Sequence, residues 1–342
     1  MASTFVQLSA SPAASLAQHV ITHLPVVVLF PHNRCNCRCV MCDIWRIKQT
    51  RQIETADLIP HLESFRKLGT RWIALSGGEA LLHDNLRGLL ELLRGEGMRI
   101  TLLSTGLLLA DNAALVTELV DDVIVSLDGP HETHNAIRRV RDAYERMAEG
   151  ISALRALRSD MPISARSTVQ KNNFRELPKT VDAARELGLN SISFLAVDAT
   201  SKAFNREDVW DEDEQARVML TADEVVELSK LLDGMSVDYA EDFRSGFIQE
   251  SPEKMRRIVR HFRSALGEIE AAAPKCKCAV GFRSGGEQRN SAALFLSCGD
   301  WEYPRAASRE IVNGESALRF RACLDMEKNA ICRRCVCSLY YS

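Results

Sequence analysis

The 342-residue chain lacks the features that would place it at a membrane or on a nucleic acid. Its net charge of -3 provides no basic field to attract a polyanion. No uncharged apolar run approaches the roughly 18 to 20 residues that a membrane span needs. Residues 1–24 have no basic start followed by an apolar core, as a secretory signal would have. We therefore expect a cytoplasmic protein that binds neither nucleic acid nor a membrane.

Cysteine is absent from residues 43–275, although the chain has 11 cysteines. Four of them lie within residues 35–42, and the other seven lie within residues 276–337. In a reducing cytosol, such groups indicate metal ligation rather than disulfides. The long gap argues against a thiol that donates hydrogen in the middle of the chain.

Short apolar runs alternate with amphipathic helices from residue 25 to about residue 200, which is typical of β/α units around a parallel sheet. The predicted strands are Val26–Phe30, Trp72–Leu75, Ile100–Ser104, Asp122–Leu127, Ile163–Val169 and Ser191–Val197. Thr55, with Asp57 two residues later, predicts the start of a helix. Gly69, Gly97 and Gly188 predict helix ends that lead into the next strand.

An acidic stretch at residues 200–222 interrupts this alternation. A charge run of this kind is typical of a solvated loop. The alternative is a lid that meets substrate, with Phe204 and Trp210 as its apolar contacts. Thr221 and Glu224 then have the spacing of a capping box. Amphipathic helices are predicted at residues 225–232 and at about 252–272, after which the cysteines return.

Cys35, Cys39 and Cys42 have the spacing C-x3-C-x2-C. Three thiolates on a four-iron cluster leave one iron without a protein ligand, and a small chelating molecule can bind there. A zinc site and scattered buried thiols are the alternatives. Cys37 lies on the same loop, and its spacing predicts a side chain that points elsewhere, as a bystander.

Three further motifs follow predicted strands. The Ser-Gly-Gly-Glu run at residues 76–79 follows the second strand, and its glycines allow a close approach to a ligand whose ammonium group the carboxylate can bind. Residues 104–106 follow the third strand, and residues 126–129 close the fourth. Because the carboxyl ends of parallel strands meet at one edge, all of these motifs should face one mouth.

The cysteine spacing, followed one strand-helix unit later by Gly-Gly-Glu, resembles the radical S-adenosylmethionine (radical SAM) superfamily. The resemblance implies an α/β fold: a partial (β/α)6 TIM-type barrel with a small C-terminal cluster-binding α+β domain. It implies a 4Fe-4S cluster on Cys35, Cys39 and Cys42 that binds SAM through its open iron. An external electron donor such as flavodoxin or ferredoxin would reduce it. The implied SAM contacts start with Gly77, Gly78 and Glu79 for the amino group and Met41 against adenine.

The same resemblance suggests more SAM contacts around the mouth. Ser126 and Asp128 occupy positions where relatives have polar contacts, although Asp-Gly-Pro is also a common turn. Ser104 lies in a variant of the family's Thr-Asn-Gly, so its role stays open. A guanidinium can pair bidentately with the methionine carboxylate, for which the candidates are Arg138, Arg139, Arg141 and Arg166. His131 and His134 are expected to be surface or capping residues.

The C-terminal cysteines resemble the auxiliary-cluster domain of the Twitch and SPASM branches, in which a short hairpin separates the first two ligands. Cys278, Cys298, Cys332 and Cys335 would hold a second 4Fe-4S cluster with no open iron. A zinc ribbon is the alternative. Cys276, Cys323 and Cys337 are left over and compete as ligands. The implied domains are an extension (1–24), the barrel (25–200), an acidic loop with a helical connection (201–273) and the auxiliary domain (274–342).

The fold does not select a reaction, because it supports many chemistries. We expect hydrogen abstraction from a polar small molecule such as a sugar, aminocyclitol or nucleoside, giving oxidation or epimerisation. The alternatives are a redox-neutral decarboxylation of a sugar or nucleoside acid, a peptide-modifying maturase, and a non-catalytic iron-sulfur or zinc protein.

Overall fold

A computed structural model describes residues 19–271, 295–297, 312–325 and 327–329, together with residues 333 and 336. The described strands are β1 (Val26–His32), β2 (Trp72–Gly77), β3 (Arg99–Ser104), β4 (Asp122–Ser126), β5 (Ile163–Val169), β6 (Ser191–Ala196) and β7 (Phe295–Ser297). They form one sheet in the order β6-β5-β4-β3-β2-β1-β7, and neighbouring strands are parallel. All six strands predicted for the barrel are confirmed.

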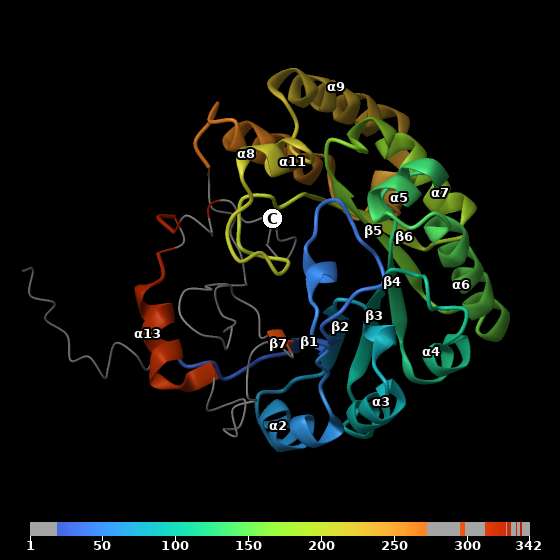
Figure 1. The fold of residues 1–342 in the computed structure, drawn as a ribbon, viewed down its shortest axis with the longest axis vertical. Helices are drawn as coiled ribbons and strands as arrows, with labels where there is room; N and C mark the ends of the chain where they lie inside the picture. The colour runs from blue at the N-terminus through green and yellow to red at the C-terminus, as the bar shows by residue number, and fades with distance from the viewer. Residues whose placement is uncertain are drawn as a thin grey trace, which may run out of the picture.

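Helices connect these strands and cover one face of the sheet (Figure 1). The described helices are α2 (Thr55–Lys67), α3 (Leu86–Gly95), α4 (Ala113–Leu119), α5 (His131–Arg138), α6 (Ala143–Leu157), α7 (Leu177–Glu186), α8 (Glu212–Ala216), α9 (Ala222–Asp238), α10 (Ala240–Ser245), α11 (Pro252–Ala265) and α13 (Glu315–Cys323), with short 3-10 helices η1 (Ile44–Arg46), η2 (Ala80–Leu82) and η3 (Phe174–Glu176). The result is the partial TIM-type barrel that the sequence predicts.

Burial alternates along the strands. In β4, Val123 and Val125 are fully buried on the face that the helices cover. Their neighbours in sequence project to the inner face of the barrel, where Ser126 is paired in register with Arg166 of β5. One face of each strand therefore supplies the core, and the other lines the barrel.

The helix ends follow the sequence signals with one exception. Gly69, Gly97 and Gly188 adopt φ values of +67°, +72° and +67°, which glycine reaches without steric cost. The predicted capping box of Thr221 and Glu224 begins α9. At α2, however, the cap is Glu54, whose backbone N–H donates to Asp57 at 2.9 Å, so the prediction of Thr55 was wrong by one residue.

The two ends of the described chain meet. The backbone N–H of Ile21 donates to Asn313 Oδ1 at 2.7 Å, and Arg321 Nε donates to the carbonyl of His19 at 2.8 Å. β7, from the segment expected in a C-terminal hairpin, instead pairs in parallel with β1 and extends the main sheet. Within the described residues, no helix is long and apolar enough to cross a membrane.

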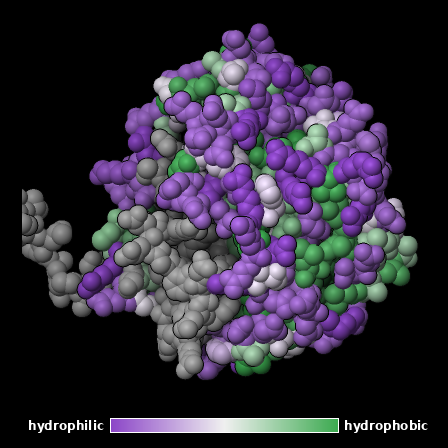
Figure 2. Space-filling model, in the orientation of Figure 1, coloured by the Kyte–Doolittle hydropathy of each residue, from purple (hydrophilic) through white to green (hydrophobic). Residues whose placement is uncertain are grey.

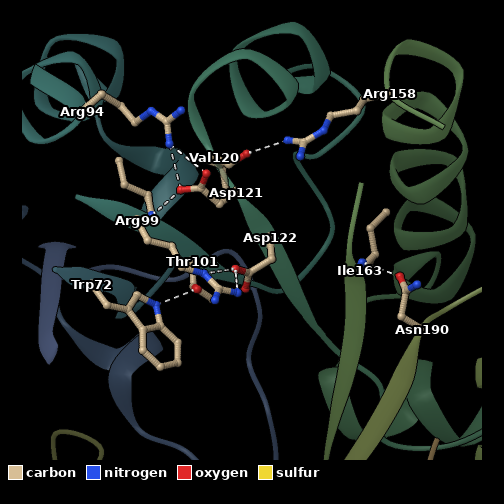
Figure 3. Close-up of polar contacts among 11 residues, drawn as sticks. Trp72, Arg94, Arg99, Thr101, Val120, Asp121, Asp122, Arg158, Ile163 and Asn190 are labelled. Carbon is tan, nitrogen blue, oxygen red and sulfur yellow. Dashed lines mark hydrogen bonds and ion pairs between the residues drawn. The ribbon is translucent and has the colours of Figure 1, made fainter. Parts of the chain in front are cut away.

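Polar contacts tie the strands together near their amino ends (Figure 3). Arg99 of β3 pairs with Asp122 of β4 at 2.6 Å, and Arg94 of α3 pairs with Asp121 at 2.8 Å. Trp72 Nε1 donates to Thr101 Oγ1 at 2.8 Å. The face of the molecule in Figure 2 is largely hydrophilic, with hydrophobic side chains gathered on the side of α4 and α6. The chemistry singled out in the sequence lies at the opposite ends of the strands.

Candidate active site at the carboxyl ends of the strands

The cysteine loop, residues 33–43, follows β1 and is fixed to the end of α5. The backbone N–H of Arg38 donates to the carbonyl of Arg138 at 3.1 Å, and that of Val40 donates to Ile137 at 3.0 Å. Cys39 is buried, whereas Cys35 and Cys42 are half-buried. The loop is therefore held by an element about one hundred residues later in the chain.

The thiols of this loop differ in their readiness to ionise. A hydrogen bond from Cys37 lowers the pKa of Cys39 to about 6, and the Arg138 guanidinium, whose Nη1 lies 3.5 Å from Cys39 Sγ, adds to this. Burial instead raises the pKa of Cys42 to about 12. Cys39 therefore ionises more readily than Cys42, which must release a proton when it binds a metal.

Cys37 does not point away from the other cysteines. Its side chain is 1 % exposed and lies within hydrogen-bonding reach of the thiols of Cys35 and Cys39, and these contacts, together with burial, raise its pKa. The expectation that it points elsewhere was wrong, because Cys37 is buried with its thiol beside those of Cys35 and Cys39. Whether it is a bystander stays a prediction.

The donor chemistry of this loop fits an iron-sulfur group. Cys35, Cys39 and Cys42 are unpaired thiols on one short segment, next to a buried guanidinium that stabilises thiolate charge. Within residues 19–271, no three His, Cys, Asp or Glu side chains surround one point as a single metal ion needs. A cubane does not require such an arrangement, since each thiolate binds a different iron.

The proposed auxiliary ligands fall almost entirely outside the described residues. These are Cys276, Cys278, Cys298, Cys332, Cys335 and Cys337. Cys323 is described, and it lies exposed at the end of α13. The second cluster stays a prediction.

The glycines of residues 76–79 fit against the cysteine loop. A Cβ on Gly78 would lie 2.0 Å from the carbonyl oxygen of Arg34, so this position accepts no side chain. Gly77 has a φ of +110°, and the backbone N–H of Glu79 donates to the same Arg34 carbonyl at 2.8 Å. The structure therefore brings the Gly-Gly-Glu motif and the cysteine loop into contact, as their positions after β1 and β2 predict.

The carboxylate of Glu79 is fully buried and accepts hydrogen bonds from the protein itself. The donors are the backbone N–H and hydroxyl of Thr105, both at 2.7 Å, and the Ser104 hydroxyl at 3.0 Å. Burial raises the pKa of Glu79. Ser104, predicted as a SAM contact, thus holds Glu79 in this structure, which links the ends of β2 and β3.

Asp128 and Arg138 form a buried ion pair. Arg138 Nη2 lies 2.5 Å from Asp128 Oδ2, and the side chains are 9 % and 0 % exposed. Asp128 also accepts from the backbone N–H of Thr168 at 2.9 Å. Burial opposes the charge of Arg138, but Asp128 and Cys39 outweigh it, so the pKa of Arg138 is raised. One guanidinium thus connects the end of β4 to the cysteine loop.

The neighbouring histidines differ from each other. His131 is exposed and contacts Glu145, as a surface residue should. His134 is fully buried, and its Nδ1 accepts from the backbone N–H of Asp128 at 3.2 Å. Burial holds the pKa of His134 well below its usual value, so the ring is neutral. The surface expectation was wrong for His134, because α5 turns it under the end of β4.

The remaining candidate SAM contacts differ in whether they lie near the mouth of the barrel. Ser126 and Arg166 are register partners on the inner face, and Arg166 Nε lies 3.4 Å from Ser193 Oγ of β6. Met41 is buried beside Cys42. Arg141 is exposed beyond α5, where its carbonyl accepts from Asn135. Arg141 is therefore not brought to the mouth with the others.

The acidic stretch after β6 contributes Arg206, which the sequence did not single out, and Trp210, which it named only as a possible contact to substrate. Its carboxylates at positions 207, 208 and 211–213 are exposed, as expected of a solvated loop. Trp210 is 8 % exposed, and its Nε1 donates to Asp43 Oδ2 at 2.7 Å. Arg206, only 2 % exposed, donates to the carbonyl of Met41 at 3.0 Å. A lone arginine and tryptophan within an acidic run were the available signal.

Comparisons with known proteins show what the part of the chain that contains this site is similar to. Residues 29–184 match the model of the "Radical SAM superfamily". The AdoMet-dependent heme synthase of Methanosarcina barkeri is 33 % identical over 164 residues, which is 45 % of each chain. The GTP 3',8-cyclase of Ectopseudomonas mendocina is 33 % identical over 182 residues, covering 51 % of this chain and 54 % of the relative. The chain therefore spans about half the length of these curated relatives.

A solved structure supports the fold over a longer range. The structure of anSMEcpe with bound AdoMet and Cp18Cys peptide aligns with a TM-score of 0.57 and 16 % identity, covering 91 % of this chain and 87 % of the other. At this identity the likeness concerns the fold alone.

Proposed function

We propose that the chain, in which residues 29–184 match the radical SAM superfamily model, reductively cleaves S-adenosylmethionine and uses the 5'-deoxyadenosyl radical to abstract hydrogen from a polar small molecule. A sugar, aminocyclitol or nucleoside is the substrate class, with oxidation or epimerisation as the outcome. The observation that carries the proposal is that two other motifs contact the cysteine loop at one edge of the sheet. Gly78 packs against Arg34 of this loop, and Arg138 contacts Cys39.

The residues of this edge would divide the work of holding the cofactors. Cys35, Cys39 and Cys42 would ligate the cluster, which supplies the electron for SAM cleavage. The backbone of Gly77 and Gly78, packed against the cysteine loop, would lie next to the amino end of SAM. Glu79 would keep that backbone in place through Ser104 and Thr105 and would supply negative charge toward the ammonium. Met41 would pack on adenine.

The inner face next to this edge favours a polar substrate. Arg166 and Ser193 lie together on β5 and β6, with Ser126 as the next register partner. Glu250 is 9 % exposed, accepts from the backbone N–H of Phe194 at 2.8 Å, and has a pKa raised by burial. A site with hydroxyl, guanidinium and carboxyl groups can bind a substrate that carries hydroxyls or amines.

The test is anaerobic reconstitution with iron, sulfide, SAM and dithionite. We expect 5'-deoxyadenosine from the wild-type chain and none from Cys39→Ala. Candidate sugars and nucleosides with deuterium at carbon should transfer the label into 5'-deoxyadenosine. Stoichiometric SAM consumption would favour oxidation, and regeneration of SAM would indicate a redox-neutral rearrangement in which 5'-deoxyadenosine returns its hydrogen to the product radical. Label transfer only from peptides would overturn the small-molecule assignment in favour of a maturase.

We propose in addition a closed auxiliary 4Fe-4S cluster on Cys278, Cys298, Cys332 and Cys335, reduced like the first by flavodoxin or ferredoxin. Two clusters predict about eight iron atoms per chain, and one predicts about four. Replacing Cys332 and Cys335 together should halve the iron content without removing 5'-deoxyadenosine formation by dithionite. Unchanged iron in that variant would contradict the assignment.

A further inference from the structure

Residues 198–210, here called the strap, connect the last strand of the barrel to the loop after the first. The strap leaves the carboxyl end of β6 and reaches the cysteine loop, where the backbone N–H of Asp43 donates to the carbonyl of Phe204 at 3.2 Å. In Figure 1 it is the yellow-green segment beside the blue loop that follows β1. Because β6 and β1 are not neighbours in the sheet, the strap bridges the mouth of the open barrel.

Arg206 is the centre of this connection. Its Nη2 donates to the Met41 carbonyl at 3.0 Å, and its Nη1 donates to the carbonyl of Ser201 within the strap at 3.1 Å. The guanidinium lies 4.0 Å from the centroid of the Trp210 ring. Trp210 in turn donates to Asp43. The residues on both sides of Cys42 are therefore bound to the strap.

The charge of Arg206 has no carboxylate partner within residues 19–271, although the side chain is 2 % exposed. Burial lowers the pKa of Arg206. Asp198 and Cys42, which form no ion pair with the guanidinium, oppose this effect through longer-range electrostatic attraction. Among the residues that the structure describes, none accepts a hydrogen bond from Arg206 Nε. Burying an unpaired cation costs several kcal/mol, by order of magnitude, unless nearby negative charge offsets it.

The backbone of the strap is strained where it touches the cysteine loop. Phe204 and Asn205 have φ values of +59° and +66°, a conformation that costs about 1–2 kcal/mol at Phe204 and that asparagine tolerates better. The Phe204 carbonyl accepts from Asp43, and Asn205 Nδ2 lies 3.4 Å from the Asp43 carbonyl. The strain is therefore located at the contact itself, where other interactions must sustain it.

We propose that Arg206 is a positioning residue for the iron-sulfur group: it fixes residues 41–43 from the strap, and its buried charge is matched by the Cys42 thiolate when the group is bound. This inference rests on the proposed function. A buried cation that interacts electrostatically with a ligand thiolate also favours the more negative, reduced state of the cluster. Loading of the cluster should in turn stabilise the strap, because the same interaction acts on both partners.

The test compares Arg206→Met, which removes the charge, with Arg206→Lys, which keeps it, in reconstituted full-length protein. We expect the reduction potential of the SAM-binding cluster, followed by electron paramagnetic resonance, to shift to a more negative value in Arg206→Met. Arg206→Lys should recover most of that shift. Arg217→Met is the matched control, because Arg217 is exposed just beyond the strap, and it should leave the potential unchanged.

Limited proteolysis provides a second readout that needs no turnover. Cleavage within residues 198–210 should be slower in the loaded wild-type chain than in the cluster-free chain, and this difference should shrink in Arg206→Met. If Arg206→Met binds no iron, Arg206→Lys must restore the iron; a lysine variant that does not would overturn the inference. An Arg206→Met protein with full iron and the wild-type potential would also overturn it. A wild-type chain without iron would overturn the proposed function itself.

Discussion

Two arginine-aspartate pairs at opposite ends of the same strands have nearly the same geometry. Arg138–Asp128, at the carboxyl ends, has an N–O distance of 2.5 Å, and Arg99–Asp122, at the amino ends, has one of 2.6 Å. Their side chains are 9 % and 0 % exposed in the first pair and 57 % and 13 % in the second. The N–O distance alone therefore does not indicate how much an ion pair contributes to stability. The two pairs differ in burial, which determines the cost of removing one partner.

The two edges also differ in how completely their polar atoms are satisfied. Buried atoms without a hydrogen-bond partner occur around the cysteine loop, including Asn36 Nδ2, His134 Nε2 and Arg206 Nε. At the amino edge, Arg94 Nη1, Arg99 Nη2 and Trp72 Nε1 each donate to a side-chain oxygen (Figure 3). The satisfied donors at the amino edge stabilise the barrel. The unsatisfied buried atoms near the cysteine loop destabilise it, as is typical of a binding site.

The largest effect should come from the cysteines themselves. We expect Cys39→Ser to abolish both iron binding and 5'-deoxyadenosine formation, since the cluster loses one of three ligands. Cys37→Ser is a matched change two residues away. It should keep the iron content and the 5'-deoxyadenosine yield within about a factor of two of wild type, because it removes weak thiol hydrogen bonds and no cluster ligand. Iron per chain and 5'-deoxyadenosine yield are the measurements. Loss of iron in Cys37→Ser would make Cys37 a ligand.

The paired arginines should differ next. Arg138→Met leaves the buried Asp128 carboxylate without its partner, which costs about 3–5 kcal/mol of unfolding free energy. Arg99→Met breaks an exposed pair and should cost about 0–1 kcal/mol. Urea unfolding of both variants measures the contrast. Equal losses would show that burial does not distinguish the two edges.

Two glycines provide a smaller contrast. Gly78→Ala forces a Cβ against the Arg34 carbonyl, and we expect a loss of about 1–3 kcal/mol together with weaker SAM binding. Gly95→Ala, in α3, meets no atom within 4 Å and should stabilise the chain by about 0.5–1 kcal/mol. Thermal unfolding and SAM titration test both. Normal SAM affinity in a folded Gly78→Ala protein would separate this motif from the cofactor.

The smallest signal is the titration of one thiol. Because the folded pKa of Cys39 is lowered to about 6 from 9.0, its thiolate contributes stability that is full above pH 9 and is lost as the pH falls through about 6. In the cluster-free chain, a rise in thiolate ultraviolet absorbance near pH 6 should vanish in Cys39→Ser. It should persist in Cys323→Ser, since that cysteine is exposed on α13. A rise in absorbance that starts only near pH 9 would show that Cys37 and Arg138 do not lower the pKa of Cys39.

The barrel was predictable because its signals are local. The predicted strands are runs of four to seven residues, and the glycines of left-handed turns follow the helices directly in the sequence. β5 has the bounds that the sequence predicts. Motifs placed after consecutive strands meet at one edge by topology, which is why Gly78 and Arg34 could be expected to approach each other.

The contacts that tune the site were not predictable, because they join distant parts of the chain. Arg138 reaches Cys39 across 99 positions, and Arg206 reaches Met41 across 165. Nothing in the local pattern distinguishes Arg138 from Arg141, yet the turn of α5 buries one and exposes the other. The orientation of Cys37 likewise depends on how the whole loop folds against α5.

The most direct measurement is the electron paramagnetic resonance spectrum of the reduced, reconstituted protein with and without SAM. The three-cysteine loop predicts that SAM binds the open iron, so its addition should change the spectrum of the wild-type cluster, and SAM labelled with a magnetic nucleus at its amino group should show hyperfine coupling to that cluster. An iron-loaded protein whose spectrum is the same with and without SAM would contradict the account.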